Sequence, residues 1–119
     1  MSSHSEHDLA CDLSALTPEQ REHHMAQSPK LFALVQEVRE LPDGYSFRLP
    51  ASVALTQITD FIAHERLCCP FFSFGITVEP YGGAIWLSLS GEGGVKALTR
   101  AEIMGYLPEG VARAAGLRS

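Results

Sequence analysis

Apolar and polar side chains alternate along three segments of the chain, and this alternation predicts β-strands with one buried face. Apolar residues recur at every second position within 45–49, 72–78 and 85–89. The sequence Pro-Asp-Gly at 42–44 is typical of a turn, so residues 35–41 are predicted to form the other strand of a hairpin, with a helix end as the alternative. The sequence Pro-Tyr-Gly-Gly at 80–83 joins the last two segments into a second hairpin.

Three other segments carry the spacing or the boundary signals of helices. The first begins with a capping box at 17–20 and is expected to end at Ser28-Pro29, because proline restricts the residue before it. The second is predicted from about 51 to 69, where Pro70 stops it. The third follows a glycine-rich turn and spans 95 to about 104.

This order of elements predicts an α+β fold. We expect a two-layer sandwich, ferredoxin-like or related, in which an antiparallel sheet of about four strands has helices packed on one face. Residues 1–16 are polar and are predicted to be a flexible N-terminal arm, and 17–119 a single domain. A length of 119 residues, 45% of them hydrophobic and 19% charged, is typical of one globular domain.

Charge and composition limit the classes of partner and the location that we expect for the protein. Nine Lys and Arg against fourteen Asp and Glu give a net charge of −5 with no basic cluster, which argues against nucleic acid. No apolar run approaches the roughly 18 residues of a membrane span, and the N-terminus lacks a signal peptide, so a cytoplasmic protein with reduced thiols is expected. The three cysteines are Cys11, Cys68 and Cys69, an odd number with two adjacent, which is poor material for a disulfide framework.

The second predicted helix places a carboxylate and two thiols on an apolar face. At about 100° per residue, its apolar side chains fall in one arc of roughly 140°, and Glu65, Cys68 and Cys69 lie inside that arc. A buried carboxylate is costly unless it is paired, hydrogen-bonded or protonated. The group that compensates Glu65 is therefore central to the function.

These residues form a candidate metal site. Glu65 can reach Cys68 at i+3 and Cys69 at i+4, and His64 can reach Cys68 at i+4. Thiolates, imidazole and carboxylate suit zinc or a softer thiophilic ion, either divalent or monovalent, or a small thiol-reactive ligand. Adjacent cysteines do not easily supply two tetrahedral positions, which favours an open or dimer-shared site. No organic cofactor is indicated.

Three alternatives stay open. In the first, the cysteines are structural, and Glu65 pairs with an arginine such as Arg48 or accepts backbone amides. In the second, the chain is a non-catalytic interaction or homodimerisation domain whose exposed sheet face carries Trp86 and Phe71. In the third, it is a thiol-dependent enzyme with Glu65 as the base, although a helix C-terminus disfavours a thiolate.

Further histidines are weaker metal candidates. His4, His7 and Cys11 could bind a metal, and the arm matters for the thiol site only if it folds over the cysteines. His23 and His24 point about 100° apart on a helix, which favours a solvated polar segment.

Two motifs, Glu-Leu-Pro-Asp-Gly-Tyr at 40–45 and Glu-Arg-Leu-Cys-Cys-Pro-Phe-Phe at 65–72, resemble those of a family of small uncharacterised bacterial proteins. The resemblance extends over roughly 11–103 and includes Gly-Glu-Gly-Gly-Val-Lys at 91–96. It implies a shared fold and no mechanism, so the function has to be argued from the residues.

Overall fold

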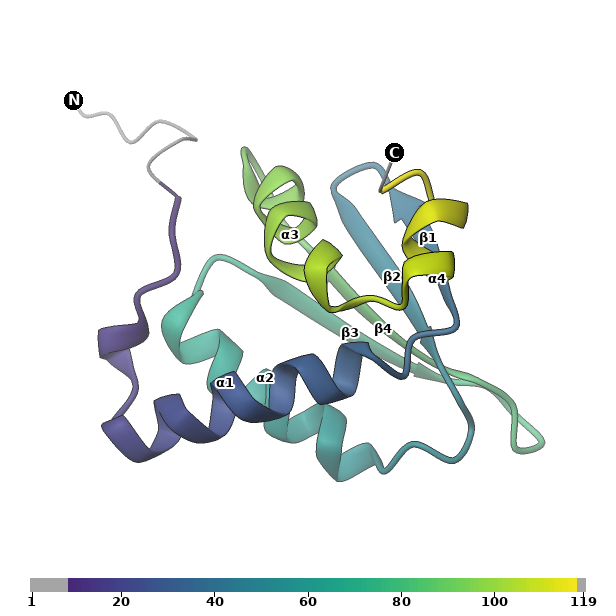
Figure 1. The fold of residues 1–119 in the computed structure, drawn as a ribbon, viewed down its shortest axis with the longest axis horizontal. Coiled ribbons are helices and arrows are strands. Elements are labelled where there is room, and N and C mark those ends of the chain that lie inside the picture. The colour runs from purple at the N-terminus through teal and green to yellow at the C-terminus, as the bar shows by residue number, and fades with distance from the viewer. Residues whose placement is uncertain (1–8, 118–119) are drawn as a thin grey trace.

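The computed structural model describes residues 9–117. An antiparallel four-stranded sheet is covered by helices on one face (Figure 1), as the pattern of the sequence predicts. The strands are β1 (Glu37–Leu41), β2 (Gly44–Leu49), β3 (Ser73–Val78) and β4 (Ile85–Ser90). The helices are α1 (Pro18–Phe32), α2 (Leu55–Cys68), α3 (Val95–Ile103) and α4 (Glu109–Ala114), with short 3-10 turns η2 (Leu13–Ala15) and η3 (Met104–Tyr106). No described helix is long and apolar enough to cross a membrane.

The strand order β1-β2-β4-β3 contains a split β-α-β unit. β2 and β3 both pair with β4 in the antiparallel sense, so they run parallel to each other with β4 between them. Helix α2 makes the crossover from β2 to β3. The split β-α-β unit is the building block of ferredoxin-like sheets, and here the outer strand beside β2 is the preceding strand β1. Residues 35–41 therefore contain a strand rather than a helix end.

The core lies between the sheet and the helices. On β2 and β4 every second side chain points to this layer, as a period of two requires. The buried sheet residues are Tyr45, Phe47, Leu49, Ile85, Leu87 and Leu89. Phe32 of α1 and Phe61 of α2 pack edge-on at 5.2 Å between ring centroids, and Phe32 packs in the same way on Phe47. This aromatic contact holds α1 and α2 together over the sheet.

Helix α1 begins where the sequence predicts but extends past Pro29. Thr17 and Gln20 form the capping box in both directions. The prediction that Ser28-Pro29 ends the helix is wrong, because the next turn buries Leu31 and Phe32 almost completely. The burial of two large side chains, each contributing about 1.5–3 kcal/mol, offsets the roughly 3 kcal/mol that an internal proline costs.

Two other boundaries differ from the predicted ones. Helix α2 begins at Leu55 rather than near 51, because residues 50–53 form a turn closed by the hydrogen bond from Val53 N to Pro50 O at 3.0 Å. The tail after 105, for which the sequence gives no clear register, forms η3 and α4 and buries Ala112 and Leu117.

The predicted arm is partly folded. Residues 1–8, which contain His4 and His7, lie outside the described residues. Residues 9–16 pack against the domain: Leu16 is buried, and Leu9 and Cys11 contact the core. The backbone N–H of Asp12 donates to the Cys68 carbonyl at 2.7 Å. The boundary between arm and domain is thus earlier than residue 17 for the described part of the chain.

The opposite face of the sheet does not carry the expected aromatic patch. Trp86 is only 7% exposed, and the guanidinium of Arg39 lies 4.1 Å from its ring centre. Phe71 precedes β3 and packs on Phe72 at the edge of the core. Among the described residues these two side chains therefore form no common exposed surface, and homodimerisation stays a prediction.

Candidate functional site

A cavity of about 400 Å³ lies between α1, α2, α3 and the N-terminal segment 9–16. Its walls are largely apolar. Its titratable or cysteine side chains are Cys11, His24, Glu65, Cys68, Cys69, Glu102 and Tyr106. A cavity of this size with a few converging polar groups is typical of a small-ligand site.

Two of the three cysteine sulfur atoms at the cavity are joined. Cys11 and Cys69 form a disulfide, and Cys68 is a buried free cysteine. The Sγ of Cys68 lies 3.6 Å from the Sγ of Cys69. The expectation of reduced thiols is therefore wrong for Cys11 and Cys69 in this structure. The bond forms because the N-terminal segment folds back over the end of α2. Its apolar residues Leu9 and Leu16 are the sequence signal for that packing.

Glu65 is compensated by a histidine of the neighbouring helix. A hydrogen bond of 2.6 Å joins Glu65 Oε1 to His24 Nε2, and both residues are 5% exposed. The suggested alternative of a pair with Arg48 is wrong, because Arg48 lies on the opposite sheet face, 3.7 Å from Glu37. The Ser28 hydroxyl donates to the His24 carbonyl at 2.8 Å and lies 3.4 Å from Nδ1. His24 is thus held at both ring nitrogens.

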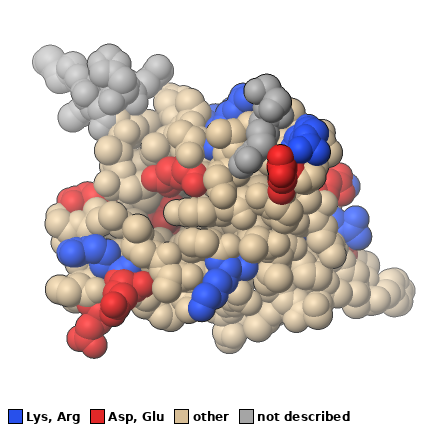
Figure 2. All heavy atoms as spheres, viewed as in Figure 1, with Lys and Arg blue, Asp and Glu red and all other residues tan. Residues whose placement is uncertain are grey.

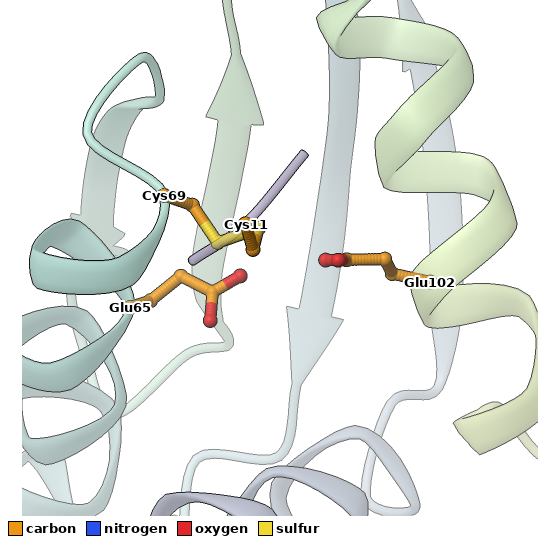
Figure 3. Close-up of side chains that lie close together, drawn as sticks. All are labelled: Cys11, Glu65, Cys69 and Glu102. Carbon is orange, nitrogen blue, oxygen red and sulfur yellow. A yellow bond between two sulfur atoms is a disulfide. The ribbon is translucent and has the colours of Figure 1, made fainter. Parts of the chain in front are cut away.

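A second carboxylate faces Glu65 across the cavity. Glu102 projects from α3 and Glu65 from α2, and both point towards the Cys11–Cys69 disulfide (Figure 3). Burial and, to a smaller extent, the nearby charge of Glu65 together raise the pKa of the Glu102 carboxyl to about 7, partly opposed by His24. On the face drawn in Figure 2, acidic and basic side chains are interspersed over a largely uncharged surface. Glu65 and Glu102 place two acidic groups in the apolar setting of the cavity.

The free thiol of Cys68 is held in its protonated form. Burial raises its pKa to about 11, and the neighbouring Glu65 carboxylate contributes to the rise. The thiol lies 3.6 Å from the Glu65 carbonyl oxygen and 3.9 Å from Oε1. A reactive cysteine has the opposite environment, with a lowered pKa beside a cation or a helix N-terminus.

The structure divides the predicted site residues between two clusters. Glu65, Cys68 and Cys69 come together at the cavity, as predicted from the face of the helix. His64 instead lies with His23 and Asp60 on the outer side of α1 and α2, where its Nδ1 donates to the Asp60 carbonyl at 2.8 Å.

Two members of the cavity cluster were not predicted from the sequence. The prediction of a solvated segment is wrong for His24, whose ring is buried, and holds for its neighbour His23, which is exposed. Glu102 lies at i+4 from Leu98, which places it on the cavity-facing side of α3. Its position on the same helix face as an apolar residue is the sequence signal for its location.

Possible ligand atoms gather in two overlapping groups at the cavity. In each group, one ligand atom from every residue lies within 4.8 Å of those of the others. The first contains Cys11, Glu65, Cys69 and Glu102, and the second His24, Glu65 and Cys68. The fold and the cavity thus define an α+β protein with a largely buried cluster of cysteines and carboxylates. No family model, curated protein or solved structure matches the chain.

Proposed function

We propose that the reduced protein binds a thiophilic metal ion through Cys68 and Cys69, with Cys11 as a third sulfur ligand and Glu65 beside them. The observation that carries the proposal is the convergence of all three cysteines of the chain on one cavity wall, next to two carboxylates. Thiolates select zinc, cadmium, mercury or copper(I) over harder ions.

The spacing of the adjacent sulfurs suits this chemistry. Zinc–thiolate bonds of about 2.3 Å place two sulfurs of a tetrahedral site roughly 3.8 Å apart. The 3.6 Å between the sulfur atoms of Cys68 and Cys69 is close to that value. This spacing, measured with Cys69 in its disulfide, supports the proposal that both adjacent cysteines contribute ligands at the end of α2.

The charge of the cavity supports a cation. Glu65 and Glu102 face each other in an apolar environment, and the pKa of Glu102 is raised mainly by burial and secondly by the charge of Glu65. A divalent ion would offset this repulsion and would replace the proton of the Cys68 thiol. Metal binding therefore releases protons and strengthens as the pH rises.

The disulfide makes binding dependent on reduction. While Cys11 and Cys69 are joined, neither sulfur is available as a thiolate. The proposal thus requires a reducing compartment, such as the cytoplasm expected from the sequence. It is favoured over a thiol-dependent enzyme, because a Cys68 pKa of about 11 leaves little thiolate at neutral pH.

The test is a titration of reduced, metal-free protein with zinc, cadmium and mercury, followed by the ultraviolet charge-transfer absorbance of metal-bound thiolate. We expect saturable absorbance that is absent from Cys68→Ser/Cys69→Ser and from the oxidised wild type. Cys11→Ser should bind more weakly than the wild type. Equal absorbance in the reduced wild type and the double variant, or none in either, would overturn the proposal.

A further inference from the structure

A second cluster of metal-ligand side chains lies on the outer side of α1 and α2. His23 of α1 contacts Asp60 of α2, with 2.7 Å between Nε2 and Oδ2. His64 is 3.6 Å from the same carboxylate, measured from Nδ1 to Oδ1. One ligand atom from each of the three residues lies within 4.8 Å of the other two. Two imidazoles and a carboxylate thus converge from two helices.

We propose that His23, Asp60 and His64 form a surface site for a divalent ion of borderline softness, such as zinc, nickel or copper(II). Imidazole and carboxylate are suitable ligands for these ions, and no sulfur takes part. Asp60 and His64 are separated by four residues, so they share one face of α2, and α1 supplies the third ligand across the helix pair.

The side chains can adjust to the ion. Bonds of about 2.0–2.1 Å place tetrahedral ligand atoms roughly 3.3 Å apart, and the pair His23 and Asp60 is already closer than that. The His23 side chain is 46% exposed and Asp60 37%, so both have room to move, whereas His64 is 17% exposed. Because Nδ1 of His64 donates to the Asp60 carbonyl, His64 binds an ion either through Nε2, which keeps that hydrogen bond, or through Nδ1 once its proton is lost. His23 and Asp60 are therefore the adjustable ligands, and the remaining positions are open to water.

This site is chemically independent of the cysteine site in the cavity, which consists of Cys11, Cys68, Cys69 and Glu65. The two share no ligand, although the rings of His24 and His64 stack with 5.8 Å between their centroids. The outer site needs no reduction, because its ligands are unaffected by the state of the Cys11–Cys69 disulfide. It can therefore be tested in protein that has no free thiol.

The parent for the test is the full-length Cys68→Ser variant with the disulfide intact. Zinc binding is measured by titration calorimetry, and copper(II) binding by electron paramagnetic resonance, which reports the number of coordinated imidazole nitrogens. We compare His23→Gln and Asp60→Asn, which keep side-chain size close to that of the original. Glu22→Gln serves as a matched control, because it removes an exposed charge next to His23. A His4→Gln/His7→Gln variant tests the N-terminal histidines.

We expect one saturable zinc in the parent, bound at least tenfold more weakly by His23→Gln and Asp60→Asn and equally well by both controls. The copper spectrum should show two imidazole nitrogens in the parent and one in His23→Gln. Parent protein that binds no zinc saturably would overturn the inference. So would unchanged binding in His23→Gln and Asp60→Asn, or binding that depends on His4 and His7. None of these results bears on the thiol site.

Discussion

Reducing the Cys11–Cys69 disulfide should remove a large part of the stability of the protein. The bond closes a loop with a sequence separation of 58 residues. The loss of chain entropy in the unfolded state for a loop of this length corresponds to roughly 4 kcal/mol at 25 °C. For a domain of this size, that change lowers Tm by about 15 °C.

The assay is denaturant unfolding of oxidised and reduced protein in the presence of a chelator. The fluorescence of Trp86, the single tryptophan, reports unfolding because its ring is buried under Arg39. Cys68→Ser is the matched control, since it keeps the disulfide and should show the same difference between the two states. Oxidised and reduced wild type that unfold at the same denaturant concentration would refute this account of the N-terminal segment.

Three further outcomes follow from the cavity. His24→Leu should destabilise the protein by about 3–5 kcal/mol, because it leaves the Glu65 carboxylate buried and unpaired. The double variant His24→Leu/Glu65→Leu should recover most of this loss in the same unfolding assay. The pKa of Glu102 is about 7 in the folded state against an ordinary 4.5. Between these pH values the folded state keeps a proton that the unfolded state has lost. The contribution of Glu102 to stability therefore falls as the pH rises from 4.5 to 7. Glu102→Gln should remove that contribution, seen as a flatter pH dependence of the unfolding free energy. Cys68 should react slowly with iodoacetamide at pH 8 and faster towards pH 11, followed by mass spectrometry, and rapid labelling at pH 7 would contradict its burial.

The fold was largely predictable because its strands obey a simple period. Alternation on β2 and β4 follows the buried face of the sheet, and the turn at 42–44 fixed the first hairpin. On β3 the prediction of a buried face is wrong beyond Phe74, because this strand lies at the sheet edge and Ile76 and Val78 are exposed. The end of α1 is another exception, because the helix continues past Pro29. A local preference against helix was outweighed by the burial of Leu31 and Phe32, which depends on the sheet that α1 covers.

The candidate site was predictable only within one helix. The face shared by Glu65 and Cys68 follows from helical geometry, whereas the partner of Glu65 depends on how α1 packs against α2. Packing selects His24 and leaves its neighbour His23 outside. The pairing of Cys11 with Cys69 depends on where the N-terminal segment lies, and sequence spacing carries no information about contacts over such a separation.

The disulfide also divides the chain into a covalent ring and a remainder. The ring contains α1, β1, β2 and α2, while β3, β4 and α3 follow it. The central strand β4, which pairs with β2 on one side and β3 on the other, therefore comes from outside the ring. The disulfide restricts the conformations of the unfolded chain within the ring. It does not restrict the distance between β2, inside the ring, and β4, outside it. Since non-local pairing is the slow part of forming such sheets, the docking of the second hairpin onto the ring should set the folding rate.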